Sequence, residues 1–458
     1  MNQADFELAP HSAEGWAQRG AKLLQLDRPE EAVRACRRAL AIDPRHRPAR
    51  IHLAAGLFAM GQPDEAETIC GAYLALDPRD QESRLLLAHG LIMKGDLAQA
   101  LGLLQTALVQ EPANPGARQM IQHVAIQLGH WPELRKVMER QLESFSGPKL
   151  EMERANIHLL FGEWTQGWEL YESRLQDPAL APPGWQFTKP AWNGAPFPGR
   201  TVLLHWEQGL GDTLMFLRYA PRVKALGGSV VLVAQGELAE LAATCPGVDQ
   251  VIPHLGRLPP YDFHLSLLSL PRVFGTQPGT VPAAIPYLGP PGRVPNRAAL
   301  ASALAASQGK TRVGLVWAGR PAHKKDHERS IPPGALAPLA ALPGVAWHSF
   351  QMDPAQLAPL PGILPLAPWL SDFSDTAYAL TGMDLVITVD TAMAHLAGAM
   401  GVPTLLLLPF LPDFRWLLER DDSPWYPTMR LYRQPQPGDW DAVIRKVLLD
   451  LASGPGDA

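Results

Sequence analysis

Apolar positions in the first third of the chain recur every three to four residues, which is the period of amphipathic helices. Pro44, Pro78 and Pro112, each preceded by an acidic residue, interrupt this pattern at intervals of 34 residues. Proline cannot continue a helix, so each of these steps predicts a helix end. The small and apolar residues that keep the same interval are Ala32, Ala66 and Ala100, and Leu23, Leu57 and Leu91. The pattern therefore predicts pairs of antiparallel helices that repeat over residues 13–112.

This spacing matches the tetratricopeptide pattern. A fourth unit over residues 115–142 keeps the helical period but loses the signature, and residues 150–175 predict two short helices that close the solenoid. Repeats of this kind stack into a curved surface whose concave face generally holds a peptide or another protein. We expect a protein partner on that face, with a spacer or a dimerisation arm as the alternative.

The rest of the chain alternates short apolar runs with helical patterns after a Pro/Gly-rich segment at residues 177–199. The runs TVLLH, SVVLVA and VDQVI form one series, and RVGLVW, VAWHSF, DLVITV and PTLLLL form a second. Alternation of this kind predicts largely parallel sheets with helices on both faces. The predicted fold class is α + α/β. Its parts are a solenoid with capping helices (1–175), a linker (176–199), a first Rossmann-like half (200–290), and a second half with a C-terminal segment that packs back (291–458).

The amino-acid composition excludes some classes of binding partner and some cellular locations for this protein. The 458 residues carry a formal net charge of −5, so the chain lacks the basic footprint of a nucleic-acid-binding protein. Three cysteines cannot form a disulfide framework and indicate a reducing compartment. The longest apolar run, residues 402–411, is about half of the ~20 residues that a membrane-spanning helix needs. We expect a cytoplasmic protein without a membrane span.

Candidate chemistry begins where the first predicted strand ends. Gly209 and Gly211 let the backbone turn sharply and approach a ligand closely, and Asp212 follows them. A carboxylate at this place can remove a proton from an attacking hydroxyl group. The structural alternative is that Asp212 caps the helix that starts there.

Further polar residues follow the strands of the second series. Ligands of open α/β sheets lie beyond the carboxyl ends of the strands, so these residues are expected to line one crevice. His323 and His327 suggest a metal pair, but lysines stand between them and no acidic third ligand is fixed nearby. We therefore expect no metal. The candidates for donor binding at the strand ends of both series are Gly209, Gly211, Arg320, Lys324, Lys325, Arg329, Gln351, Asp390, Thr391 and His395.

Four segments in order carry a resemblance to a known family: EQGLGDTLMFLRYAP, GLVWAGRPAHKKDHERSIP, DLVITVDTAMAHLAGAMGVP and LLERDDSPWYPTMRLYRQ. The combination resembles the bacterial tetratricopeptide-fused glycosyltransferases. Their catalytic half is similar to the heptosyltransferases of glycosyltransferase family 9 and, more distantly, to the protein O-GlcNAc transferases. The resemblance implies the B-type glycosyltransferase fold, in which two Rossmann-like halves bind the sugar nucleotide mainly through the second half.

The resemblance also implies roles for single residues. Asp212 matches the proposed general base, and Asp390, Thr391 and His395 match an Asp-Thr-Gly-x-x-His motif at the sugar-nucleotide site. Ala392 stands where that motif has glycine. The basic loop after the RVGLVW run, with Arg320, Lys324, Lys325 and Arg329, would neutralise the leaving diphosphate, a task that a metal performs in other transferases.

Together these features predict an inverting, metal-independent glycosyltransferase. It would need no cofactor beyond its nucleotide diphosphate sugar substrate, and its acceptor would be a protein held by the repeats. The alternatives are a non-catalytic scaffold that senses a nucleotide sugar, and an epimerase that acts on the nucleotide sugar itself.

Overall fold

The computed structural model describes residues 11–112, 114–133, 135–136, 139, 147–176, 187–253, 257–321, 326–340, 342–353 and 362–453. It divides the chain into two compact units, Met1–Ser146 and Gly147–Ala458. In the described residues, every helix is too short or too polar to cross a lipid bilayer.

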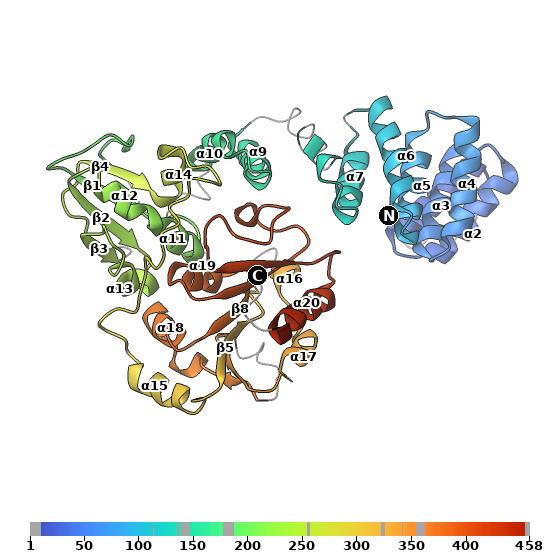
Figure 1. Cartoon of the computed structure of the whole chain (residues 1–458). Helices are drawn as coiled ribbons and strands as arrows, with labels where there is room; N and C mark the ends of the chain where they lie inside the picture. The colour runs from blue at the N-terminus through green and yellow to red at the C-terminus, as the bar shows by residue number, and fades with distance from the viewer. Residues whose placement is uncertain are drawn as a thin grey trace. The chain divides into compact units, whose positions relative to one another are not determined.

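The first unit consists of antiparallel helices in the predicted 34-residue register (Figure 1). Asp43, Asp77 and Glu111, the acidic residues before the repeat prolines, each occupy the C-cap position of a helix. Ala32, which lies where two helices touch, is fully buried. The prediction of tetratricopeptide repeats is confirmed. The helices are α1 (Ala13–Gln25), α2 (Pro29–Ile42), α3 (Arg47–Ala59), α4 (Pro63–Leu76), α5 (Gln81–Lys94), α6 (Leu97–Gln110) and α7 (Pro115–Gln127).

The two short helices expected to close the solenoid belong instead to the second unit. They are α9 (Pro148–Leu160) and α10 (Trp164–Tyr171), followed by the 3-10 helix η2 (Glu172–Gln176). The indole of Trp164 stacks on Trp425 at 5.0 Å, and Trp168 meets Phe216 and Phe414 edge to face. Burial of side chains as large as tryptophan contributes strongly to the stability of the folded state. The core of the second unit buries both tryptophans, which explains why α9 and α10 belong to it.

The first sheet is parallel, with strand order β3-β2-β1-β4. Its described helices pack on one face, against the residues that alternate with Leu203 and Val231 along the strands. We expected helices on both faces. Within the described ranges, the opposite face is covered by Phe187, Trp206 and other apolar side chains from loops. The strands are β1 (Thr201–His205), β2 (Ser229–Ala234), β3 (Gln250–Pro253) and β4 (Phe263–Ser266), and the helices that follow them are α11 (Leu210–Phe216), α12 (Ala220–Lys224), α13 (Ala239–Ala242) and α14 (Leu270–Val273).

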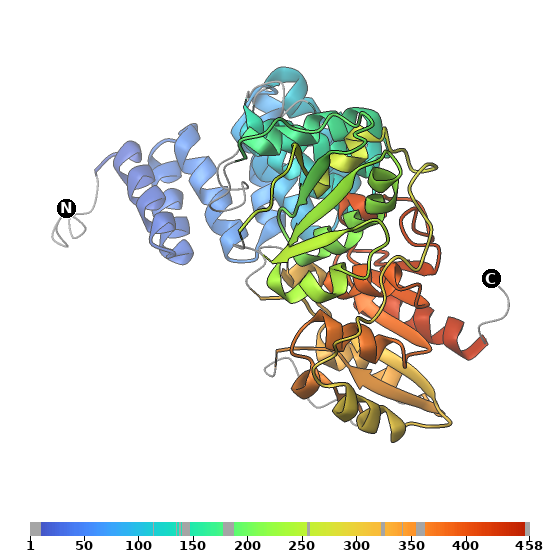
Figure 2. The same cartoon turned by 90° about the vertical axis from the view of Figure 1, so that its left-hand side faces the viewer.

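The second sheet is also parallel, with order β10-β9-β8-β5-β6-β7, and lies apart from the first (Figures 1 and 2). Here helices cover both faces, as predicted: α18 (Phe373–Leu380) and α19 (Ala392–Ala399) on one, α17 (Ala337–Ala340) and α20 (Trp440–Ser453) on the other. The strands are β5 (Thr311–Val316), β6 (Val345–Ser349), β7 (Leu364–Pro365), β8 (Leu385–Val389), β9 (Thr404–Leu408) and β10 (Met429–Arg433).

We expect a fragment that starts at residue 147 to fold and one that starts at residue 177 to fail. The shorter fragment loses Trp164 and Trp168, and removing one buried tryptophan alone typically costs about 3–5 kcal/mol. Thermal unfolding of both fragments checks this expectation. Equal melting temperatures would contradict the assignment of α9 and α10 to the second unit.

Candidate functional site

Both sheets reverse their strand order at a switch point, where ligands of α/β folds bind. In the first sheet the switch lies between β1 and β4, and in the second between β5 and β8. Asp212 lies in the first turn of α11 after β1, Gly319 follows β5, and Asp390 follows β8. Asp212, Gly319 and Asp390 therefore follow strands that lie at the two switch points, whereas Gln351 follows the neighbouring strand β6.

Asp212 makes two contacts, one local and one distant. Its Oδ2 accepts a hydrogen bond from the backbone N–H of Gly209 at 2.9 Å. The capping alternative placed Asp212 just before the helix, but α11 begins at Leu210, so Gly209 is the N-cap and Asp212 is the third helical residue, which bonds back to it. Its Oδ1 accepts a hydrogen bond from Nη2 of Arg415, in the short 3-10 helix η9 (Phe414–Trp416) after β9. The carboxylate thus caps its own helix and also joins the two Rossmann-like halves through an ion pair.

Arg415 lies among several carboxylates. Its Nη1 donates to Asp413 Oδ1 at 2.6 Å, and Asp390 is close enough to act on it electrostatically. Burial opposes its charged form, but Asp413 and Asp212 outweigh burial and hold the pKa of Arg415 well above its ordinary value. The guanidinium is therefore the permanent positive charge that holds these acidic groups together.

Asp390 has an altered acidity. Burial raises its pKa to about 6, and the negative charge of Asp413 adds to the shift. Its backbone carbonyl accepts a hydrogen bond from Nη1 of Arg329 at 2.9 Å. Arg329 in turn pairs with Asp326 at 3.0 Å, within the helix α16 (Asp326–Arg329).

Gly319 and Gln351 complete this set of contacts. A Cβ at Gly319 would collide with the charged ends of Asp326 and Arg329, so a larger residue here would displace that ion pair. The buried side chain of Gln351 bonds both backbone groups of Ala318, donating to its oxygen at 3.1 Å and accepting from its nitrogen at 3.2 Å. The structure therefore links Gln351, Arg329, Asp390 and Asp212 through neighbouring groups.

Thr391 and His395 are engaged within the protein. Thr391 is the N-cap of α19, and its Oγ1 accepts a hydrogen bond from Met393 N at 3.3 Å. His395 is 5% exposed, its Nδ1 lies 2.9 Å from the hydroxyl of Tyr426, and its ring stacks on Trp416. Burial, with the charges of Arg415 and Arg218, lowers the pKa of His395 well below its ordinary value, so the ring is neutral. Contact of His395 with a donor stays a prediction.

Gly211 meets His395 directly. A Cβ at this glycine would stand 2.8 Å from the His395 ring, which is closer than real Cβ atoms come to their neighbours. Glycine is therefore required here for close packing of α11 on α19, in addition to its freedom in a turn.

Three of the predicted residues add little to this geometry. Arg320 is exposed beside Gly319. Lys324 and Lys325 lie outside the described residues, as does His323 of the suggested metal pair. Among the residues that the structure describes, His, Cys, Asp and Glu side chains do not gather in a group of three that could hold a metal ion.

Sequence reasoning missed Arg415 and a second buried ion pair beside it. Arg174 of η2 and Glu207, just after β1, are 0% and 1% exposed as side chains, and their charged groups lie 2.9 Å apart. The Glu207 carboxylate also accepts a hydrogen bond from Ser266, at the end of β4. Glu207 lies within the segment HWEQGLGD, so a carboxylate after a buried strand was the available signal.

Backbone strain flanks the Asp212–Arg415 pair. Gln208 has φ +58° and Leu417 has φ +56°, in the left-handed region that non-glycine residues avoid. Such conformations cost on the order of 1–3 kcal/mol each and cluster at functional sites. The backbone on both sides of the Asp212–Arg415 pair is therefore held in conformations that cost stability, as is common at functional sites.

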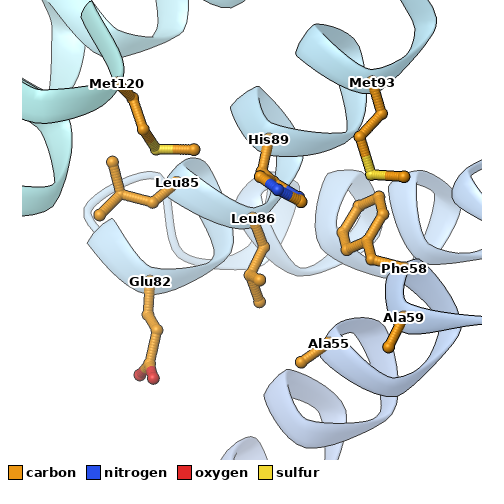
Figure 3. A pocket seen from close by; sticks show the side chains of 9 residues that line it. All are labelled: Ala55, Phe58, Ala59, Glu82, Leu85, Leu86, His89, Met93 and Met120. Carbon is orange, nitrogen blue, oxygen red and sulfur yellow. The ribbon is translucent and has the colours of Figure 1, made fainter. Parts of the chain in front are cut away.

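The repeats contain a pocket of about 660 Å³, shown in Figure 3. Phe58 forms part of its wall and meets the ring of His89 edge to face at 5.6 Å. Met93 is 50% exposed, which is high for a large apolar side chain. The lining comes from α3, α5 and α7: Ala55, Phe58, Ala59, Glu82, Leu85, Leu86, His89, Met93 and Met120.

Comparison with known proteins assigns the first unit. A tetratricopeptide repeat family model matches residues 23–90, so the N-terminal helices are tetratricopeptide repeats. One curated relative is Protein FlbA of Caulobacter vibrioides, which is 28% identical over 333 residues. The match covers 65% of this chain and 54% of that protein, so the chain spans about half of its relative's length.

Solved structures similar to part of the chain include tetratricopeptide proteins. A thermophilic TPR protein of Thermus thermophilus is 21% identical with a TM-score of 0.28, covering 37% of this chain and 92% of its own. PilF of Pseudomonas aeruginosa is 22% identical with a TM-score of 0.31, covering 36% of this chain and 75% of its own. The assignment of the repeats rests on the family model and on the observed helices, and not on these two likenesses.

The raised pKa of Asp390 predicts a pH effect on stability. Between about pH 4 and pH 6 the folded protein keeps a proton on Asp390 that the unfolded chain has lost. The stabilising contribution is therefore complete below about pH 4 and is lost as the pH rises through about 6. Urea unfolding should show that the free-energy difference between the wild type and Asp390→Asn falls over this range by on the order of 1–2 kcal/mol. Parallel pH profiles would contradict the shift.

Proposed function

We propose that the second unit is an inverting glycosyltransferase of the B-type fold, which moves a sugar from a nucleotide diphosphate to an acceptor hydroxyl without a metal ion. The observation that carries the proposal is the position of Asp212 at the first switch point, in contact with the charged groups of the second. The family resemblance of the four sequence segments supports it.

The proposed reaction assigns the parts of the site to steps. The acceptor oxygen attacks the anomeric carbon, its proton passes to the Asp212 carboxylate, and the bond from that carbon to the diphosphate oxygen breaks. The diphosphate leaves with the bonding electrons and needs positive charge beside it. Arg329, with Lys324 and Lys325 of the same basic loop, would supply part of that charge, and Asp390 would accept hydrogen bonds from sugar hydroxyl groups.

The repeats would bring the acceptor. Tetratricopeptide repeats typically bind protein partners, and the pocket between α3, α5 and α7 is lined mainly by apolar side chains. Methionine adapts its shape to different apolar partners, and Met93 and Met120 both line this pocket. We propose that an apolar segment of a protein acceptor binds there.

The second candidate function is a non-catalytic scaffold that senses a nucleotide sugar. It would use the same repeats and the same donor site but would not convert the donor. Slow hydrolysis of the donor by the purified chain would separate the two functions, because a scaffold releases its ligand unchanged.

Asp212→Asn should keep the fold and still bind the donor, while transfer falls by about two to four powers of ten. Asparagine is nearly isosteric and can still cap α11. Transfer is measured with radiolabelled donor, and thermal unfolding checks the fold. A folded variant with wild-type transfer would show that Asp212 is a cap and no base.

Met93→Asp places a charge in the repeat pocket and should raise KM for a protein acceptor by about tenfold or more, since an apolar contact becomes an unpaired charge. Donor hydrolysis should not change. Val109→Asp is the matched control, because Val109 is 80% exposed on α6 and does not line the pocket. Equal KM values for the two variants would exclude this pocket as the acceptor site.

A further inference from the structure

We propose that Arg415 is a diphosphate-binding residue that Asp212 holds in the donor-free protein, so that donor binding releases the base. The inference rests on the proposed function and names a residue for the same site. Its starting point is that Arg415 links the candidate base to the switch point of the second sheet.

The donor groups of Arg415 are only partly used. Nη2 donates to Asp212, and Nη1 donates to Asp413 at 2.6 Å. Nε is buried and has no hydrogen-bond partner among the described residues. A guanidinium offers five N–H groups in a planar fork that matches phosphate oxygens, so this side chain can bind a diphosphate with the groups it already has.

The charge balance favours an exchange of partners. Three acidic groups, those of Asp212, Asp390 and Asp413, act on Arg415. Burial, together with the negative charge of Asp413, makes Asp390 hold a proton more readily than usual. A diphosphate brings more negative charge than one carboxylate and binds arginine in a bidentate manner. Asp212 is therefore the weaker partner once a donor is present.

The exchange would order the reaction. While Arg415 occupies Oδ1 of Asp212, an acceptor hydroxyl competes with it for that oxygen. When the guanidinium turns to the diphosphate, Oδ1 becomes free to take the hydroxyl proton. The same arginine then stabilises the charge that the leaving diphosphate gains as its bond to the anomeric carbon breaks.

Local geometry fits a movement of the side chain alone. Leu417, two residues after Arg415, is held at φ +56°, and Gln208 is held at φ +58° before the turn that carries Asp212. Both backbone segments are thus fixed in unusual conformations, whereas the arginine stem has several rotatable bonds. Phe414 lies under the guanidinium at 4.5 Å and offers a flat surface across which it can slide.

Arg415→Gln tests the assignment through binding. The probes are inorganic pyrophosphate and the diphosphates of uridine, guanosine, thymidine and cytidine, titrated calorimetrically into the full chain. We expect the variant to bind the best of these probes about 10- to 100-fold more weakly. Arg420→Gln is the matched control, because Arg420 lies in the same segment but pairs with Asp422 at the surface, and it should bind like the wild type.

Asp212→Asn gives a second result whose sign is diagnostic. If Asp212 competes with the diphosphate for Arg415, this variant should bind the probe about three- to tenfold more tightly than the wild type. A structural ion pair predicts unchanged or weaker binding, and that outcome would overturn the proposal even if Arg415→Gln failed to fold.

The failures remain distinguishable. A wild type that binds none of the probes would overturn both the transferase and this inference. A wild type that binds a probe while Arg415→Gln binds it equally well would overturn the inference alone.

Discussion

The aromatic contacts of α10 hold the second unit together. Trp168 touches Phe216 of the first half and Phe414 and Trp425 of the second, so a single side chain is buried against both. Buried aromatic clusters of this kind combine a large apolar area with preferred ring geometry. The positions of α11 and of the loop after β9 depend on this contact, and with them the distance between Asp212 and Arg415.

That constraint explains why charged groups can meet at the junction. An ion pair removed from water is stabilising only when its geometry is held and its remaining groups are paired. The Arg174–Glu207 pair lies on the side of η2 and β1, and the Asp212–Arg415 pair lies beside the loop after β9. Both are placed by backbone that the aromatic cluster fixes. The site is therefore a consequence of the packing of α10 and η2 as much as of the two sheets.

Much of the fold follows from local sequence. The 34-residue interval and the alternation of apolar runs are local signals, and the repeats and both parallel sheets match them. The place of α9 and α10 could not be predicted, because a helical pattern states which face is apolar but not which neighbour covers it. The face of the first sheet that lacks helices could not be predicted for the same reason. Its strands are apolar on both faces, and this pattern does not tell whether helices or loops cover each face.

The part of the site that could be predicted consists of residues that directly follow strands. Asp212, Gly319 and Asp390 follow strands that lie at the switch points of the two sheets, and Arg415 connects Asp212 of the first sheet with Asp390 of the second. Arg415 gave no signal, because its partner lies in the other half of the fold and only the folded chain unites them. Some residues of the four sequence segments that carry the resemblance, such as Arg218 with Trp425, pack the halves together, with the guanidinium 5.3 Å from the indole ring.

The contact between Gly211 and His395 constrains how the sequence of this protein can change in evolution. The two positions share one small space, in which a methyl group at 211 leaves no room for an imidazole at 395. Neither position can change freely while the other stays as it is. Among diverged relatives, the two sites are therefore expected to covary, a larger residue at one accompanying a smaller residue at the other, and such paired changes would record the docking of α11 on α19 in sequences alone.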